Sequence, residues 1–130
     1  VASHSLKPRA HIVAHARNSL EPKDFTLAPI GAAEQVLAKA GWNAADVDLW
    51  EINEAFAMVT MLTTRALDLD PACVNVHGGA CAQGHPIGST GSRIIVTLMH
   101  ALKHYGKQRG VAALCIGGGE ATAVAIELVA

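Results

Sequence analysis

The sequence predicts an α/β domain in which a mixed, mainly parallel five-stranded sheet is covered by helices. The chain has 130 residues, the size of one domain with a single core. Short apolar runs alternate along it with longer segments in which hydrophobic residues recur at helical spacing. Strands that alternate with helices favour parallel pairing through right-handed crossovers. The expected order of elements is β-α-β-α-β-α-β-β.

The first half of the chain is expected to supply two strands and two helices. Residues 10–16 form a short apolar run that is typical of a strand. A helix is predicted over residues 29–40, because its hydrophobic residues share one face, a proline begins it and a glycine follows it. Residues 47–52 are the second strand candidate. An apolar helix is expected to begin at Asn53 and to run to about Leu67.

The second half is expected to add a strand, a glycine-rich loop, a helix and a final pair of strands. Residues 73–76 are a short strand candidate, and residues 78–91 contain too much glycine to be regular structure. Hydrophobic residues at helical spacing predict a helix over residues 90–105. The last two strand candidates, residues 111–116 and 121–129, are so close together that an antiparallel hairpin is expected.

The composition excludes several classes of partner. With 51% hydrophobic residues, 16% charged residues and a net charge of -1, the chain is typical of a well-packed globular domain and not of a nucleic-acid-binding one. Its apolar stretches are too short to span a bilayer, so no membrane partner is expected. Many alanines and few aromatic residues favour helices packed closely on a sheet.

Cysteine and histidine spacing predicts neither a disulfide framework nor a metal site. The cysteines are odd in number and form no C-x-x-C pair: Cys73, Cys81 and Cys115. This usage indicates a reducing compartment, and the cytoplasm is the expected location. The start of the chain, Val1-Ala2-Ser3, shows no secretory signal pattern. The seven histidines are scattered along the chain, and no bound metal is expected from their spacing.

Three polar or reactive side chains are expected at one rim of the sheet. In an open parallel sheet, ligands bind beyond the carboxyl ends of the strands. Asn53 follows the second predicted strand, His85 lies in the glycine-rich loop after the third, and Cys115 ends the fourth. We therefore expect an amide, an imidazole and a thiol to gather there.

Each of these residues also has a purely structural interpretation. A cysteine in an apolar strand is usually an inert core residue, a lone loop histidine is often merely exposed, and asparagine is a common helix N-cap. Two features favour a catalytic role over the structural one. Residues 117–119 are three glycines, which leave room beside the Cys115 sulfur and leave N–H groups free for an oxyanion. His85 lies between Gly84 and Pro86, which fix its backbone, and imidazole suits proton transfer near neutral pH.

Two other kinds of site are disfavoured by the glycine-rich loop. A phosphate-binding loop would need a lysine after Gly84, where this chain has His85. A serine-hydrolase elbow would need the pattern G-x-S-x-G, whereas Gly88-Ser89-Thr90-Gly91 has a different spacing. Neither a nucleotide-phosphate module nor a serine hydrolase is therefore predicted.

Three groups of residues are informative when taken together. They are Asn53-Glu54-Ala55-Phe56, then Gly78-Gly79-Ala80 with Gly84-His85-Pro86-Ile87-Gly88, and finally Cys115-Ile116-Gly117-Gly118-Gly119. They resemble the three C-terminal motifs of the thiolase family, and the resemblance extends over essentially the whole chain, residues 1–130. It implies one of two matching α/β halves. The N-terminal half, which supplies a nucleophilic cysteine in this family, is not in the chain.

The resemblance implies a role for each site residue in acyl transfer between coenzyme A thioesters. His85 would take the proton of the nucleophilic cysteine, and Cys115 would be the second acid–base group, acting on the α-carbon. Asn53, through a water and together with His85, would stabilise the enolate oxygen. The Gly117 N–H would help to hold the acyl-enzyme oxyanion.

The resemblance also implies substrates and partners. Coenzyme A thioesters are the expected substrates, contacted by Ala55 and Phe56, with no permanently bound cofactor. The full-length enzyme would be an acetyl-CoA C-acyltransferase of fatty acid metabolism, a homodimer or tetramer that catalyses Claisen condensation or thiolytic cleavage of 3-ketoacyl-CoA. The isolated domain is expected to be inactive without the N-terminal thiolase domain. The alternative is a non-catalytic thiolase-like binding or assembly subunit.

Three residues near the site depart from the commonest family pattern. Cys81 and Gln83 stand where small or aliphatic residues usually precede the histidine, and Glu120 stands where an apolar or amide residue is usual. A carboxylate that pointed toward Cys115 would raise the pKa of its thiol.

Overall fold

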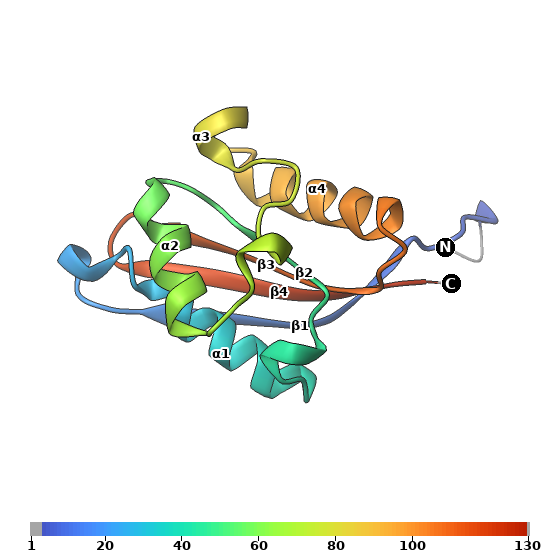
Figure 1. Ribbon diagram of the computed structural model, residues 1–130, viewed down its shortest axis with the longest axis horizontal. Coiled ribbons are helices and arrows are strands. Elements are labelled where there is room, and N and C mark those ends of the chain that lie inside the picture. The colour runs from blue at the N-terminus through green and yellow to red at the C-terminus, as the bar shows by residue number, and fades with distance from the viewer. Residues whose placement is uncertain (1–3, 130) are drawn as a thin grey trace.

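The computed structural model describes residues 4–129, in which helices cover both faces of a four-stranded sheet (Figure 1). The strands are β1 (Ala10–Ser19), β2 (Leu49–Ile52), β3 (Arg109–Ile116) and β4 (Glu120–Leu128), in the spatial order β1-β4-β3-β2. The helices are α1 (Ala28–Ala40), α2 (Ala57–Ala66), the short α3 (Ala80–Gln83) and α4 (Thr90–His104), with 3-10 turns at Pro22–Asp24, Ala44–Asp46 and Pro71–Cys73. The expectations for Val1-Ala2-Ser3, and the outermost ends of the predicted domain, lie outside the described residues.

The sheet is mixed, but its strand number and pairing differ from the prediction. Within residues 4–129 it has four strands and not five. β2 pairs parallel with β3, whereas β4 pairs antiparallel with both β1 and β3. β1, β2 and β3 therefore run in the same direction, yet two of the three ladders are antiparallel. The tight turn after β3 places β4 against it, and β1 then takes the outer edge of β4.

The segment predicted as the third strand contributes a single bridge to the described sheet. Pro71–Cys73 forms a 3-10 turn, and Val74 then bridges to Trp50 of β2. Asn75 has a left-handed backbone conformation with φ 49°, which ends extended pairing. The side chain of Asn75 then makes the two hydrogen bonds to Ile52 that a paired strand would make with its backbone. The Ile52 N–H donates to Asn75 Oδ1 at 2.8 Å, and Asn75 Nδ2 donates to the Ile52 carbonyl at 2.9 Å.

Helix α1 lies close to the sheet because both surfaces carry small side chains. The helix has Pro29 in its first turn and ends at Gly41, whose φ of 69° is left-handed, as the sequence predicts. Alanines of the sheet and of the helix are buried together in one core: Ala16, Ala113, Ala121, Ala123 and Ala125 with Ala28, Ala32 and Ala33. The alanine-rich composition is thus used for close packing of a helix on a sheet.

Helix α2 begins four residues later than predicted. Its N-cap residue is Phe56, so the capping interpretation of Asn53 is wrong. Residues 53–56 instead form a bend between β2 and α2. On the opposite face of the sheet, α4 buries Leu98 and Leu102 against β2 and β3. The bend after β2 and the start of α4 are the two places from which the candidate site is built.

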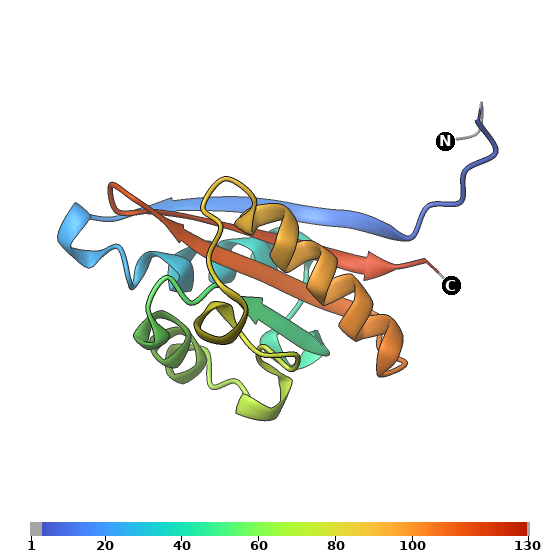
Figure 2. The same ribbon diagram turned by 90° about the horizontal axis from the view of Figure 1, so that it is seen from above.

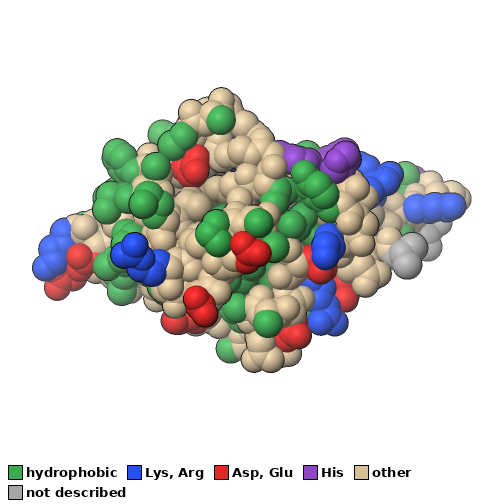
Figure 3. Space-filling model, in the orientation of Figure 1, with side chains coloured by type: hydrophobic (Ala, Val, Ile, Leu, Met, Phe, Trp, Pro, Cys, Tyr) green, Lys and Arg blue, Asp and Glu red, His purple; other side chains and the backbone are tan. Residues whose placement is uncertain are grey.

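Several surface features follow from this arrangement. Ala10 of β1 pairs with Leu128 of β4, so the start of the first strand and the end of the last lie side by side (Figure 2). Hydrophobic side chains reach the surface around α2 (Figure 3), where Met58 and Met61 are exposed. Within residues 4–129, no helix has both the length and the apolar composition needed to cross a membrane.

The turn between β3 and β4 depends on Gly119. Its φ of 92° is left-handed, and a Cβ there would collide with the backbone carbonyl oxygen of Leu20. We expect Gly119→Ala to lower the free energy of unfolding by about 3 kcal/mol, because both the strain and a backbone contact resist relaxation. Chemical denaturation measures this loss. Gly88→Ala is the matched control, since the space beside Gly88 is open. Equal losses in the two variants would contradict the prediction.

Candidate functional site

A cavity near the carboxyl end of β3 contains several of the predicted site residues. His85, Cys115, Gly117 and Ala55 line it, and its volume is about 250 Å³. The other lining residues are Phe25, Ile87, Thr90, Leu114 and Ile116. Since β2 and β3 are parallel, the segments that follow them emerge at the same edge of the sheet. The structure therefore brings the imidazole and the thiol to one cavity.

The ring of His85 is oriented by Thr90. His85 Nδ1 lies 2.7 Å from Thr90 Oγ1, and the Thr90 hydroxyl donates to the Pro86 carbonyl at 3.0 Å. A hydroxyl has one proton to donate, so Thr90 Oγ1 accepts its second hydrogen bond from a protonated Nδ1. The neutral ring then has its lone pair on Nε2. This tautomer is the one that a general base needs.

Cys115 brings a buried thiol to the cavity. It is 8% exposed and belongs to the core beneath α1. Burial raises the pKa of the thiol, opposed by a hydrogen bond from its own backbone N–H. Glu120 is not the cause, because it is exposed and lines a different cavity, with Arg17 and Lys39. The thiol is therefore neutral near pH 7, and its thiolate is a strong base once formed.

Asn53 lies beside this cavity and not in its lining. The residue is 1% exposed, and its backbone N–H donates to the Ala113 carbonyl at 2.9 Å. Its Oδ1 accepts a hydrogen bond from Arg93 Nη2 at 3.0 Å. Its Nδ2 is buried and has no hydrogen-bond partner among residues 4–129. The amide thus keeps an open donor, the kind of group that holds a water or a carbonyl oxygen.

The remaining predicted residues differ in their relation to the cavity. Ala55 lines it, and Gly117 lies at its exposed side with open space next to its Cα. Phe56 is 58% exposed and does not line it. Its ring meets Phe25, which does line the cavity, at a centroid distance of 6.0 Å and an interplanar angle of 64°. Phe56 therefore contacts a residue of the cavity lining but does not itself line the cavity.

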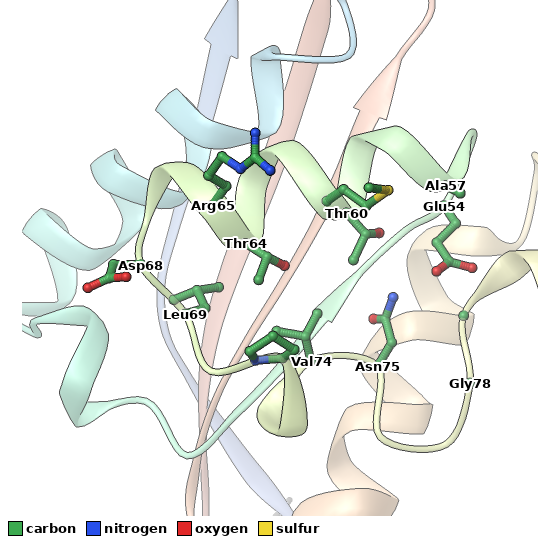
Figure 4. Close-up of a pocket in the computed structure, with 13 residues that line it drawn as sticks. Glu54, Ala57, Thr60, Thr64, Arg65, Asp68, Leu69, Val74, Asn75 and Gly78 are labelled. Atoms are coloured by element: carbon green, nitrogen blue, oxygen red, sulfur yellow. The ribbon is translucent and has the colours of Figure 1, made fainter.

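A larger cavity, of about 700 Å³, lies between α2 and residues 71–79 (Figure 4). Its lining includes Thr60, Thr64 and Arg65 of α2, with Glu54 near one end. None of the described residues that line it is a cysteine or a histidine. Chemistry that needs a thiol and an imidazole is therefore supported at the smaller cavity.

A carboxyl group is buried on β2, on the same strand face as Asn53. Glu51 is 1% exposed, and its Oε1 has no hydrogen-bond partner in the described part of the chain. Burial raises the pKa of Glu51 from an ordinary 4.5 to about 7, although the Arg93 charge opposes this rise. At neutral pH this carboxyl group is therefore only partly ionised.

The raised pKa of Glu51 predicts a pH dependence of stability. Because the folded-state value exceeds the unfolded one, the stabilising contribution is complete below about pH 4.5 and is lost as the pH rises to about 7. The loss is about 3 kcal/mol. We expect Glu51→Gln, which cannot ionise, to remove this component. Chemical denaturation across that pH range checks it, with Glu34→Gln on the exposed side of α1 as control. Parallel curves for wild type and Glu51→Gln would show the prediction to be wrong.

The prediction that the histidines are scattered without paired spacing is wrong for one pair. His100 and His104 are one turn apart on α4. His104 packs against His77 at 5.9 Å and Tyr105 at 4.8 Å between ring centroids, and histidine side chains form a patch on the face seen in Figure 3. Over residues 4–129, no group of three or more His, Cys, Asp or Glu side chains is placed to hold a metal ion.

Thr90 and Arg93 orient site residues, but the sequence patterns indicate only that they begin a helix. They lie three residues apart in the first turns of α4, so their side chains share a face. Thr90 contacts His85, and Arg93 contacts Asn53. A hydroxyl and a guanidinium at this spacing, just after the glycine-rich loop, are the only signal that the sequence offers for these roles.

Comparison with known proteins gives a consistent set of similarities. A family model described as "Thiolase, C-terminal domain" matches residues 6–128. The chain is 52% identical over 122 residues to cytosolic acetyl-CoA acetyltransferase of Mus musculus, and 49% identical over 122 residues to mitochondrial acetyl-CoA acetyltransferase of Rattus norvegicus. These matches cover 94% of this chain but 31% and 28% of the relatives. The chain thus spans about a third of the length of the curated relatives that it matches.

Solved structures agree with this similarity. The acetyl-CoA acetyltransferase of Bacillus anthracis superposes with a TM-score of 0.94 at 43% identity, covering 98% of this chain and 32% of that one. The Acat5 thiolase from Ascaris suum in complex with coenzyme A gives 0.92 at 47% identity, covering 99% and 33%. Human mitochondrial 3-ketoacyl-CoA thiolase gives 0.95 at 42% identity, covering 99% and 33%.

Proposed function

Because this chain belongs to the thiolase family as a C-terminal domain, we propose that it forms one half of an active site for acyl transfer between coenzyme A thioesters. The reaction is Claisen condensation or thiolytic cleavage of a 3-ketoacyl-CoA. One observation carries the proposal: an imidazole whose Nδ1 is hydrogen-bonded to Thr90 and a buried thiol line the same cavity. The relative from Ascaris suum, which is in complex with coenzyme A, supports this class of substrate.

His85 is proposed as the first proton acceptor. Its Nδ1 proton is engaged by Thr90, which leaves Nε2 to take the proton of a nucleophilic thiol. That thiol becomes acylated as coenzyme A leaves the incoming thioester. We propose that it comes from the N-terminal half of a thiolase, so this chain alone is expected to be inactive.

Cys115 is proposed as the second acid–base group. In condensation, its thiolate removes an α-proton from acetyl-CoA, and the resulting enolate attacks the acyl group on the nucleophile. In cleavage, the neutral thiol returns that proton to the enolate. The raised pKa of Cys115 suits both steps, since the neutral thiol is the resting form and the thiolate is strongly basic.

Three donors are proposed for the oxygens that gain charge. The open Nδ2 of Asn53 supports a role in holding a water at the enolate oxygen, together with His85. The open space beside Gly117 supports a role for its N–H at the acyl-enzyme oxyanion. Ala55 is proposed as a substrate contact, whereas Phe56, predicted as a second one, is proposed to act indirectly by packing against Phe25. A homodimer or tetramer remains part of the proposal, as does a cytoplasmic location, although relatives named for the cytosol and for the mitochondrion both match.

Reconstitution tests the proposed function. This chain is mixed with the N-terminal half of the Mus musculus relative, giving what is here called the assembled enzyme, and acetoacetyl-CoA cleavage by coenzyme A is followed. Turnover is expected from the mixture and from neither half alone. Two folded halves that associate without turnover would overturn the proposal and favour the non-catalytic assembly subunit. Cleavage by this chain alone would also contradict it.

A further inference from the structure

A guanidinium near the start of α4 connects the two segments that carry the site. Arg93 Nη2 donates to Asn53 Oδ1 at 3.0 Å, and Arg93 Nη1 donates to Gln83 Oε1 at 3.2 Å. Asn53 follows β2, and Gln83 lies two residues before His85. One side chain therefore ties the bend after β2 to the loop that carries the imidazole.

The guanidinium also decides which way the Asn53 amide faces. An arginine side chain donates hydrogen bonds and accepts none, so it binds Oδ1 and repels the NH₂ group. A reversed amide would set two donors against each other and leave a buried oxygen without a donor. Nδ2 is consequently turned to the side where it meets no acceptor in residues 4–129. The amide is thus held with its donor open.

Arg93 is anchored in the first turn of α4, and its two terminal nitrogens are fixed by hydrogen bonds to Asn53 and Gln83. Its charge also interacts with the buried carboxyl of Glu51. The backbone N–H of Arg93 donates to the Ser89 carbonyl at 2.9 Å, which fixes the first turn of α4. Thr90, three residues earlier, holds His85. The first turns of α4 therefore set the orientation of both the imidazole and the amide.

We propose that Arg93 is a positioning residue, which orients the Asn53 amide so that Nδ2 donates to the reacting oxygen or to the water bound to it. The inference rests on the proposed function, because it assigns Arg93 to the role that Asn53 has there. Arg93 does not touch the reacting atoms. Lysine cannot replace it, since an ammonium group is a compact charge without the planar fork that spans Asn53 and Gln83.

A double-mutant cycle in the assembled enzyme tests this role. Arg93→Met and Arg93→Lys are each expected to lower kcat about 100-fold, with KM changed less than about threefold. Asn53→Ala is expected to lower kcat by at least as much. In the Asn53→Ala background, Arg93→Met is expected to have no further effect, because the group that it positions is gone. Arg17→Met, at an exposed site on β1, is the matched control for removing an arginine.

A second measurement separates this inference from the proposed function. With asparagine ¹⁵N-labelled in this chain, the Asn53 side-chain amide signal of the assembled enzyme is expected to shift in Arg93→Met and not in Arg17→Met. Shifted signals without any turnover, even in the wild type, would overturn the proposed function but support the orienting contact. Wild-type kcat in Arg93→Met, losses that multiply in the double variant, or an unmoved amide signal would overturn the inference and leave the proposed function standing.

Discussion

His85→Gln in the assembled enzyme is expected to lower the rate of acyl transfer by about 1,000-fold. The Nδ1 proton of His85 is committed to Thr90, so Nε2 is the atom available to accept a proton in the cavity. A glutamine side chain is polar but has no lone pair of comparable basicity. The nucleophilic thiol would then stay protonated. Rapid-quench measurement of enzyme acylation by saturating acetyl-CoA reports this step directly, because that half-reaction releases coenzyme A and breaks no carbon–carbon bond.

The control for this experiment is His11→Gln, a change at an exposed histidine on β1. It is expected to leave acylation at the wild-type rate. His85 is an exposed loop residue outside the core, so both variants are expected to unfold at the wild-type temperature. Thermal unfolding therefore checks that neither variant has lost its structure. Acylation by His85→Gln at more than about a tenth of the wild-type rate would exclude His85 as the base.

Local patterns were sufficient to predict α1 and α4. In α1 the hydrophobic spacing, the early Pro29 and the terminal Gly41 all indicate the same helix, and each feature acts within a few residues. The prediction of a third strand at residues 73–76 was wrong, for an equally local reason that composition does not reveal. Asn75 uses its side-chain amide to satisfy the backbone of Ile52, so no further backbone pairing is needed there.

The pairing order of the sheet could not be predicted from local patterns. Strands β3 and β4 are neighbours in sequence, and their hairpin follows from the short glycine turn. The pairing of β1 with β4, however, joins Ala10 to Leu128 across nearly the whole chain. Nothing in either segment specifies this partner over β2 or β3. It results from the packing of α1 against the alanines of β1, β3 and β4.

In the candidate site, the predicted strand ends were sufficient to predict that His85 and Cys115 meet at one edge of the sheet. They were not sufficient to predict that Asn53 lies outside the cavity lining. Successive side chains of a strand point to opposite faces. On β2, Ile52 packs in the core under α1, so Asn53 points toward α4 and its Arg93. The late start of α2 prolongs this alternation past the end of β2. The spacing of Thr90 and Arg93 places both side chains on one face of α4, but it does not specify their partners, because these depend on how α4 lies against the loop.

The second large effect is expected from Cys115→Ser, which should lower overall turnover of the assembled enzyme about 1,000-fold. An alcohol has nearly the shape of the thiol but is a far weaker acid, so it neither gives nor takes the α-proton readily. The acylation step relies on His85 and is expected to persist. In the wild type, burial holds the pKa of Cys115 above its ordinary 9.0. The rate of condensation should therefore keep rising with pH through the alkaline range, and this rise should be absent in the variant.

Comparing the two half-reactions makes the assignment of Cys115 testable against a structural role. If the thiol merely filled the core, Cys115→Ser would lower thermal stability and slow acylation and condensation alike. If it is the second acid–base group, acylation stays near the wild-type rate while condensation is lost. Cys73→Ala, at a half-buried cysteine away from the cavity, is the control and should leave both steps unchanged. Condensation at the wild-type rate in Cys115→Ser would exclude the thiol from proton transfer and require another group for the α-proton.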